Sequence, residues 1–409
     1  MARSHDMTSG SIWRSLLGFS IPIMISNLVQ STYNAVDMLF VGRFTGTESL
    51  AAVSVCGPIM NVMIITLSGM SAGVLVVISG LLGAGDIKQA QDAAHTSVAL
   101  YALMAAVMTV LGLLFVPQIL RLVQTPAAAM PEAKRYLYTV FAGTVFTFGY
   151  NLIGALQRGL GNAAASMSFV IISSAANIAL DAVFIVWLGM GAFGAALGTV
   201  LSQVAAFVIG TVQFARGGAA LRLSARAVRF HKKHLKNILL FGVPTALNEV
   251  MVNLAMLTVS GVANSFGLAS SAAYGVGSRI NSLAIFTDGA MNQTMSAYAS
   301  QNIGAGRQKR ALEGLWKAII LSAGAALGTS LLVLGFASEF SACFDSDPTV
   351  IEQSAAFLRV TVWSYPLFAT VGPLIGFIRG TGNVEASLLV GVVAQLCCRV
   401  PASFLFSRW

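Results

Sequence analysis

GAGDIKQA (residues 83–90) and GAGRQKRA (residues 304–311) share Gly, Ala, Gly, Lys and Ala at a constant offset of 221 residues. QRGLGN at 157–162 and IRGTGN at 378–383 repeat at the same offset. Near the two starts, FSIPIMI at 19–25 aligns with FGVPTAL at 241–247 at an offset of 222. Self-similarity at a fixed offset is the signature of an internal repeat. We therefore expect two halves of similar build.

Both halves are apolar enough to lie in a membrane. Of the 409 residues, 56% are hydrophobic and only 10% are charged, whereas a soluble domain carries about 25% charged residues. A membrane-spanning helix needs about 20 predominantly apolar residues. Eleven segments meet this requirement: 14–41, 49–80, 92–116, 134–156, 163–189, 192–214, 236–263, 268–300, 311–336, 353–378 and 384–405.

The number of spans fixes how the halves are related. Six spans in the first half return the chain to the side where it started, so the two repeats are parallel. We expect a first transmembrane lobe at 1–214, a cytoplasmic basic linker at 215–235 and a second lobe at 236–409. Leu188 corresponds to Trp409, the last residue, so the second lobe is expected to be truncated after five spans. The predicted fold is an all-α integral membrane protein, a two-lobed bundle of parallel six-helix repeats with the last helix of the second repeat missing.

The formal net charge of +9 is distributed unevenly over the loops. If the N-terminus is cytoplasmic, most basic residues lie in the inner segments. The outer segments hold far fewer: Arg43, Arg121, Lys134, Arg135 and Arg359. This bias predicts a cytoplasmic N-terminus and a multi-pass protein of the cell inner membrane. The basic loop LRLSARAVRFHKKHLK at 221–236 favours anionic lipid headgroups over nucleic acid. We expect a monomer whose partners are membrane lipids and small-molecule substrates.

The repeated RGxGN and GAG segments could indicate a phosphate-binding loop, because glycines let a backbone approach a ligand. Neither segment matches the GxxxxGK[ST] or GxGxxG pattern, and each follows a long apolar span. Tight turns between helices are the better interpretation.

Ionisable residues inside a bilayer are costly and usually face a cavity or a partner. Asp37, Asp181, Glu249 and Asp288 are the strongest candidates. In the first span, polar residues fall at helical spacings of three and four, and they share one face: Gln30, Tyr33, Asn34 and Asp37. The fifth span does the same with Ser174, Asn177 and Asp181. We expect these two polar stripes to face each other across a water-accessible cavity.

The repeat provides a control for the acid pair. Asp181 corresponds to Ala402, and Asp37 corresponds to Thr258 or Val259, depending on the offset. Residues that serve only the scaffold should recur in both copies. A feature confined to one copy therefore favours a functional role over an architectural one. The alternative for Asp37 and Asp181 is a buried hydrogen bond that only locks two helices together.

Two facing carboxylates in an apolar setting can hold a proton between them or give it up to a cation. Asn177 and the hydroxyl of Thr199 in the sixth span would add oxygen ligands. Asp37, Asn177, Asp181 and Thr199 are therefore the predicted cation-coupling site, and they are metal ligands only if the ion is sodium. The residues leave the choice between proton and sodium open, and no other cofactor is expected.

Further polar residues are candidates for lining a substrate cavity. Gln30, Tyr33 and Asn34 share the face of Asp37, and Glu249 and Asp288 could contact a cationic substrate in the second lobe. Satisfied structural carboxylates are an equal alternative for the last two. Tyr136 and Asn151 in the fourth span complete the set.

Several segments in combination resemble the multidrug and toxic compound extrusion (MATE) transporters. They are YNAVDMLFVGR in the first span, the GAG turn after the second, RGLGN before the fifth, NIALDAVFI within it and QNIGAG after the eighth. The resemblance implies a cation-coupled efflux antiporter of two six-helix lobes. An Asp in both the first and fifth spans is similar to the DinF-like branch, in which residues matching Asp37, Asn177, Asp181 and Thr199 form the cation site, and Tyr136 and Asn151 match polar cavity positions. The chain departs from the family's NIxLDP pattern at Ala182, which predicts a weaker local bend.

We therefore expect a secondary active multidrug efflux antiporter that exports organic, cationic and amphipathic compounds in exchange for protons or sodium ions. The alternative is a flippase for lipid-linked precursors from a related superfamily, which would be expected to have a more cationic cavity. A membrane-embedded enzyme would need a catalytic cluster at one face. None of the four histidines pairs with an acid in a recognisable motif, so no enzymatic activity is expected.

Overall fold

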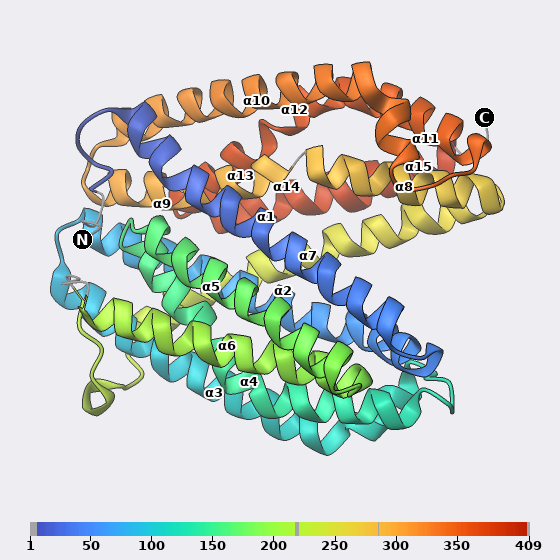
Figure 1. The fold of residues 1–409 in the computed structure, drawn as a ribbon. Helices are drawn as coiled ribbons and strands as arrows, with labels where there is room; N and C mark the ends of the chain where they lie inside the picture. The colour runs from blue at the N-terminus through green and yellow to red at the C-terminus, as the bar shows by residue number, and fades with distance from the viewer. Residues whose placement is uncertain (1–5, 217–220, 285, 407–409) are drawn as a thin grey trace. The chain divides into compact units, whose positions relative to one another are not determined.

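The computed structural model describes residues 6–216, 221–284 and 286–406, and all regular elements within these ranges are helical (Figure 1). In chain order they are α1 (Ile12–Phe44), α2 (Thr47–Gly83), α3 (Ile87–Leu122), α4 (Met130–Gly159), α5 (Ala163–Asp181), η1 (Ala182–Trp187), α6 (Gly191–Arg216), η2 (Ala225–Ala227), α7 (Lys232–Asn264), α8 (Leu268–Ala284), α9 (Phe286–Gly304), α10 (Gln308–Ala342), α11 (Pro348–Thr361), η3 (Val362–Ser364), α12 (Tyr365–Phe368), α13 (Val371–Gly380), α14 (Val384–Val392), η4 (Val393–Arg399) and α15 (Val400–Phe406). The predicted all-α fold is confirmed.

Ten helical segments in the described part of the chain are long and apolar enough to cross a membrane. Ten of the eleven predicted spans overlap with them. The eleventh, 268–300, is occupied by α8 and α9, which lie on either side of residue 285. With 17 residues, α8 is too short to span the hydrocarbon core alone, and α9 is rich in Asn, Gln, Ser and Thr.

By its internal contacts the chain divides into two compact units. The first unit comprises Met1–Asp6 and Ile21–Gly242, and the second comprises Met7–Ser20 and Val243–Trp409. This division differs from the predicted boundaries at 214 and 236, because the start of α1 packs in the second unit and the start of α7 packs in the first. The crossing points lie beside Pro22 and Pro244, and a proline inside a helix removes a backbone hydrogen bond and kinks the helix.

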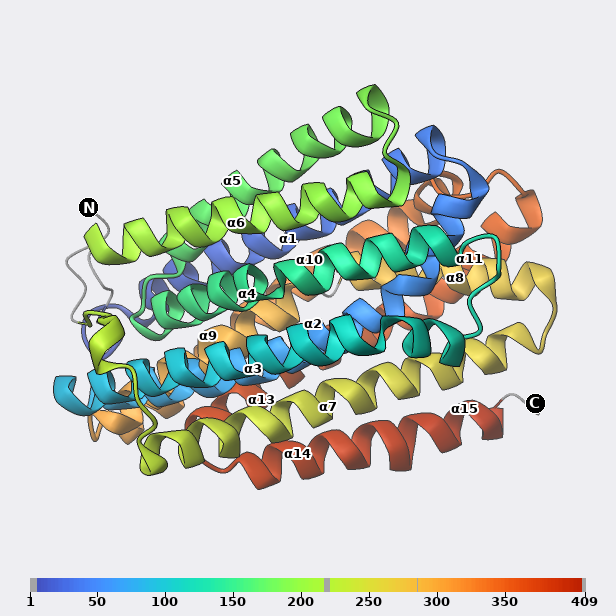
Figure 2. The same cartoon turned by 90° about the horizontal axis from the view of Figure 1, so that it is seen from below.

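In the first unit, α4 packs against α2, α3 and α6, and α5 packs against α6 (Figures 1 and 2). Large buried side chains such as Ile78, Tyr101, Phe148 and Leu156 form its main core. Leu221 from the linker is buried in the same core. The linker is thus partly an element of the first unit.

In the second unit, α9 lies against α13 in very close contact. Gly372, Gly376 and Gly380 of α13 all face α9, since a Cβ added at any of them would meet atoms of that helix. Close approach of two helices at such small residues is typical of membrane proteins. A separate core joins α8, α10 and α11.

The repeated motifs form turns, as predicted. Gly85 and Gly306 adopt positive φ angles of 73° and 72° between successive helices, a conformation that glycine adopts without steric cost. In the RGxGN motifs, Asn162 accepts a hydrogen bond from the backbone of Ala165 at 3.1 Å and Asn383 accepts one from Ala386 at 3.2 Å. Both asparagines therefore cap the following helix, α5 or α14.

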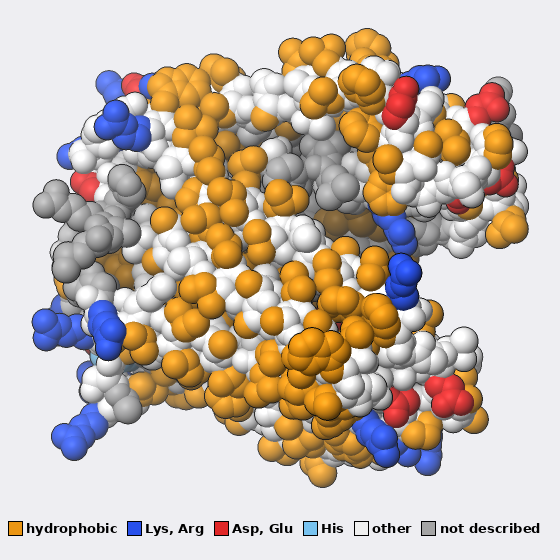
Figure 3. Space-filling model, in the orientation of Figure 1, with side chains coloured by type: hydrophobic (Ala, Val, Ile, Leu, Met, Phe, Trp, Pro, Cys, Tyr) orange, Lys and Arg blue, Asp and Glu red, His pale blue; other side chains and the backbone are white. Residues whose placement is uncertain are grey.

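Hydrophobic side chains cover much of the middle of each unit on the face shown in Figure 3, and charged side chains gather near the helix ends. Leu114 and Leu331, which lie far inside long helices, are each 63% exposed. Apolar surface of this extent is suited to contact with lipid acyl chains. A helix can lie in lipid because its backbone N–H and C=O groups form hydrogen bonds within the helix.

Candidate functional site

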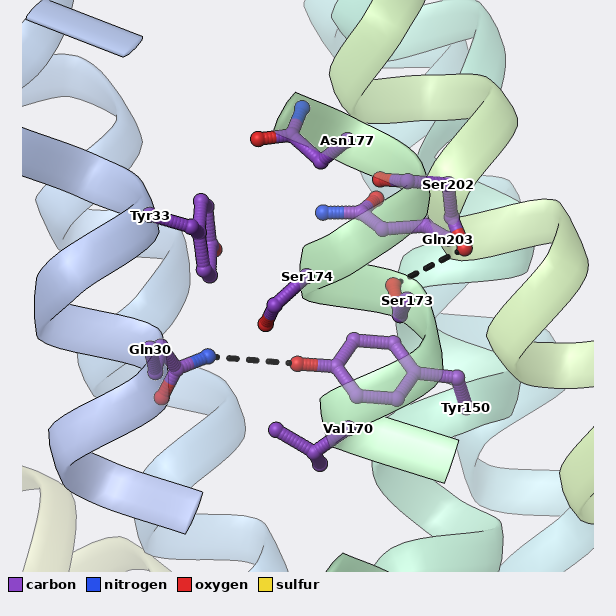
Figure 4. A pocket seen from close by; sticks show the side chains of 9 residues that line it. All are labelled: Gln30, Tyr33, Tyr150, Val170, Ser173, Ser174, Asn177, Ser202 and Gln203. Carbon is purple, nitrogen blue, oxygen red and sulfur yellow. Dashed lines mark hydrogen bonds between the residues drawn. The ribbon is translucent and has the colours of Figure 1, made fainter. Parts of the chain in front are cut away.

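A pocket in the first unit lies between side chains of α1, α4, α5 and α6 (Figure 4). Its empty volume is about 300 Å³, including open solvent at its mouth. All lining residues except one are polar and uncharged: Gln30, Tyr33, Tyr150, Val170, Ser173, Ser174, Asn177, Ser202 and Gln203. A hydrogen-bonding pocket of this kind within apolar helices is a candidate site for a polar ligand or an ion.

Helical periodicity brings these side chains to one place. On α5, Asn177 follows Ser173 by four residues and Ser174 by three. The pocket wall opposite is formed by Ser202 and Gln203, which are neighbours on α6. Ser173 Oγ donates to the backbone oxygen of Ser202 at 2.9 Å, which ties the two helices together at the pocket wall (Figure 4). Residues at such spacings share one helix face.

Asp37 of α1 and Asp181 at the end of α5 approach each other one turn beyond Asn177. Their carboxyl groups are close enough to share a hydrogen bond when one of them holds a proton. As carboxylates, neither oxygen of Asp181 nor Oδ1 of Asp37 has a hydrogen-bond partner among the described residues. Asp181 is 0% exposed. Because an unpaired buried carboxylate is very costly, this pair requires a proton or a cation.

A glycine of α6 makes room for this carboxylate. A Cβ added at Gly198 would collide with Oδ1 of Asp181. Any larger residue at this position would displace the acid, and Gly198 is adjacent to Thr199, the predicted hydroxyl ligand. The close approach of α6 to α5 beside Asp181 thus depends on the missing side chain at position 198.

The helix changes its hydrogen bonding immediately after Asp181. Residues Ala182–Trp187 form the π-helix η1, in which the amide of Leu188 donates to the carbonyl of Val183 at 3.0 Å. π-Helical turns are uncommon and are frequent at functional sites. Ala182 follows the acid here, and the weaker bend predicted from this residue stays a prediction.

Asn177 contributes the most buried polar group of the pocket wall. Its side chain is 1% exposed, and neither amide atom has a partner in the described part of the chain. The unpaired oxygens of Asp37, Asp181 and Asn177 are of the type that hard cations bind. The carboxyl groups of Asp37 and Asp181 lie within hydrogen-bonding reach of each other, and Asn177 lies one helical turn before Asp181 on α5. Thr199 follows Gly198 on α6, and its carbonyl accepts a hydrogen bond from Ser202 at 2.8 Å. The cation site formed by these four residues stays a prediction.

The substrate-cavity residues predicted for the first lobe separate into two groups. Gln30 and Tyr33 line the pocket. Asn34 is exposed and absent from the lining, and the Asn151 amide donates to the Thr147 carbonyl of its own helix at 2.8 Å. Tyr136 packs against apolar clusters outside the pocket wall. For these three residues the predicted place in a substrate cavity stays a prediction.

The two candidate acids of the second lobe belong to the second unit. Asp288 accepts a hydrogen bond from the amide of Gly372 at 2.7 Å and so caps the start of α13. This contact agrees with the structural alternative for Asp288, and its predicted contact with a substrate stays a prediction. Glu249 is partly buried in α7. The guanidinium group of Arg379 in α13 interacts electrostatically with its carboxyl group.

Ser173, Ser202 and Gln203 line the pocket without having been predicted. A signal for them exists in the sequence, because Thr199, Ser202 and Gln203 follow one another at spacings of three and four on α6. Uncharged polar residues are common in membrane helices, so this pattern stands out only after the acids are located. Ser173, Ser202 and Gln203 carry no charge, so the cost of burying an ionisable group does not single them out.

Comparison with known proteins identifies the family of this chain. The MatE family model matches residues 22–183 and again residues 244–405, so both repeats match one model at the offset of 222 residues seen in the sequence. The chain belongs to the MatE family. A probable multidrug resistance protein of Bacillus subtilis, YpnP, is 27% identical over 407 residues, covering 100% of this chain and 91% of that protein. YoeA of the same organism, also a probable multidrug resistance protein, is 29% identical over 412 residues, with coverages of 98% and 88%.

Solved structures give the same fold. The outward-facing conformation of a multidrug resistance MATE family transporter of the MOP superfamily superimposes with a TM-score of 0.92 and 25% identity, covering 100% of this chain and 91% of that one. This MatE-family chain is thus a multi-pass membrane protein of a multidrug efflux transporter family. Proteins of this family are transporters, so the expectation that the chain is no enzyme is confirmed by its membership.

Proposed function

We propose that this MatE-family protein is a secondary active antiporter that exports organic, cationic and amphipathic compounds in exchange for protons or sodium ions. The observation that carries the proposal is the pair of unpaired buried carboxylates, Asp37 and Asp181, beside a polar pocket. An acid pair that lacks a protein donor gains most from an ion that arrives from outside. The named multidrug resistance relatives support the export of drug-like compounds.

The coupling ion acts on the first unit. A proton or sodium ion on Asp37 and Asp181 cancels their repulsion and lets α1 and α5 close on each other. Without the ion, the two carboxylates repel and favour the open pocket, in which a substrate cation is attracted. An ion gradient drives export only if the ion binds one of the two states more tightly than the other.

The protein sits in the cell inner membrane with a cytoplasmic N-terminus. The support is the excess of Lys and Arg in the segments that would then face the cytoplasm, including the linker residues Arg222, Arg226, Arg229, Lys232 and Lys233. The protein works as a monomer, its partners being lipids and small-molecule substrates.

The test is transport by purified protein in proteoliposomes. A fluorescent organic cation is loaded, a sodium gradient or a proton gradient is imposed in turn, and the rate of release is measured. We expect gradient-driven release by the wild type and a loss of at least about tenfold in Asp37→Asn and Asp181→Asn, since neutral amides remove the differential ion affinity. The gradient that drives release identifies the ion.

Glu352→Gln supplies the matched control. Glu352 is an exposed acid of α11 in the second unit, and its neutralisation removes the same charge. This variant should transport at the wild-type rate. Full gradient-driven release by both Asp37→Asn and Asp181→Asn would rule out the proposed coupling site.

A further inference from the structure

Three hydrogen bonds within the protein orient polar groups of the first-unit pocket wall. Thr147 Oγ1 donates to Oε1 of Gln203. Gln30 Nε2 donates to the Tyr150 hydroxyl at 3.5 Å, and Ser173 Oγ donates to the carbonyl of Ser202. The first two bonds each occupy an acceptor and leave hydrogen atoms unused on Gln203 and on Tyr150.

The Gln203 amide is oriented by this pattern. Because its oxygen receives the Thr147 hydroxyl, its nitrogen with two hydrogens is directed away from α4, and the side chain reaches from α6 towards Tyr33 of α1 (Figure 4). No acceptor for this nitrogen occurs within the described part of the chain. Gln203 therefore presents N–H donors to the pocket.

Other donors converge on the same space. Asn177 Nδ2 is unpaired and its side chain is 1% exposed. The hydroxyl of Tyr150, whose oxygen receives Gln30, keeps its own hydrogen available. Asn177 Oδ1 is unpaired as well, but the unused hydrogens of Gln203, Asn177 and Tyr150 outnumber it, and no carboxylate lines the pocket to receive them.

We infer that the pocket binds a hydrogen-bond-accepting oxygen, such as a carbonyl, of the exported compound, and that Gln203 determines this specificity with Thr147 as its positioning residue. This inference rests on the proposed efflux function and names the chemical class of its substrate: cations that carry a carbonyl-type acceptor a short distance from the charge. A wholly apolar body in the same pocket leaves the amide donors desolvated and unpaired. Sites built to hydrogen-bond a ligand discriminate strongly against analogues that lack the bonding group.

The experiment compares two probes that differ in a single group. One is para-benzoylbenzyl trimethylammonium, a ketone, and the other is para-benzylbenzyl trimethylammonium, in which a methylene replaces the carbonyl. Equilibrium binding of both to the full-length protein in lipid nanodiscs gives a ratio of dissociation constants. We expect the wild type to bind the ketone about tenfold more tightly, a preference in the range of one hydrogen bond to a desolvated donor.

Variants of two glutamines on the same helix separate specificity from folding. Gln203→Leu should bring the ratio close to one, because it removes the hydrogen bond to the ketone and also the cost of burying an unpaired amide against the methylene probe. Gln213 of α6 accepts the Ser168 hydroxyl at 3.1 Å in the same manner but lies outside the pocket. Gln213→Leu should therefore keep the wild-type ratio. Thr147→Val, which frees the Gln203 amide to rotate, should give an intermediate ratio.

The outcomes distinguish the inference from the function on which it rests. A wild-type ratio near one, or a ratio that Gln203→Leu leaves unchanged, overturns the inference whatever the transport assays show. A ratio that depends on Gln203 supports it, and irradiation of the benzophenone probe should then crosslink to α5 or α6. Failure of gradient-driven transport with an intact binding preference would count against the antiport mechanism alone.

Discussion

Asp86 and Arg307 occupy equivalent positions in the two repeats and serve different purposes. Asp86 caps α3 by accepting the Gln89 amide at 3.0 Å. Arg307 stands before α10, makes no cap with its side chain, and donates to the backbone of Thr8. The glycine turn beside each of them is the same in both repeats. The backbone of the repeat is thus retained where a turn requires it, while the polar side chains around it have diverged.

The same contrast extends to the segments that lead into each repeat. In the second unit, Met7 donates to Gln301 Oε1 at 2.9 Å, and Arg310 donates to the carbonyl of Ser9 at 2.8 Å. In the first unit, the linker before α7 is held by Gln91, His95 and Thr96 of α3. The second unit thus holds its incoming segment with side chains at the end of α9 and the start of α10, whereas the first unit uses side chains in the first turns of α3.

The largest effect is expected where the two repeats differ in backbone packing. Gly376 of α13 is equivalent to Ala155 of α4, which is fully buried. A Cβ at Gly376 would collide with the backbone oxygen of Asn292 and lie 3.0 Å from Cβ of Met295. Gly376→Ala should lower the free energy of unfolding by about 1–3 kcal/mol through overpacking. Thermal unfolding of the detergent-solubilised protein measures the change.

Gly328→Ala is the matched control for this substitution. Gly328 lies inside α10, and a Cβ added there would meet nothing within 4 Å. Its replacement should stabilise the protein by about 0.5–1 kcal/mol, since alanine is the better helix former. Equal effects of the two variants would refute close α9–α13 packing as the reason for the glycine.

The features that the sequence predicted correctly are those that depend on short local patterns. The glycine turns at Gly85 and Gly306 and the caps at Asn162 and Asn383 depend on a few neighbouring residues, so the repeat predicted them correctly. The exchange of Met7–Ser20 into the second unit depends on tertiary contacts that no local pattern encodes.

The candidate site follows the same division. Asp37 and Asp181 were predictable because a carboxylate inside a membrane span demands an explanation. Gln203 was not, because its importance depends on where Thr147 and the pocket lie. Asp288 had the same sequence signal as Asp181, and only the contact with Gly372 reveals that it caps a helix.

An intermediate effect is expected at the linker of the first unit. Gln91 Oε1 accepts the Arg222 amide at 2.7 Å, so its nitrogen is the donor towards His95 Nε2 at 3.1 Å. The Ser224 amide points at the same Nε2 atom, at 3.4 Å. Two donors on one nitrogen require a neutral His95 with its proton on Nδ1. Removal of this acceptor by His95→Leu should therefore release this part of the linker.

Hydrogen exchange of the linker amides measures this release. In His95→Leu, which removes the acceptor, protection of the Ser224 amide should fall relative to the wild type at the same pH. His95→Gln keeps an acceptor at this position, so its protection should stay close to that of the wild type. The Met7 amide, bonded to Gln301, is an internal control that should not respond. A Ser224 amide equally protected in His95→Leu and in the wild type would contradict the bonding pattern.

The smallest effect is expected at Asp86, a partly buried cap in the turn between α2 and α3. The hydrogen bond from the Gln89 backbone, followed by that from its side chain, lowers the pKa of Asp86. Since the pKa is lower in the folded than in the unfolded chain, the cap stabilises α3 above the ordinary carboxyl pKa, and this contribution is lost as the pH falls through the lowered value. Asp86→Asn keeps a capping oxygen that does not titrate. The difference in unfolding temperature between wild type and variant should therefore shrink as the pH falls from about 6 to about 3, whereas Arg307→Gln in the equivalent turn of the second repeat should change stability by the same amount throughout.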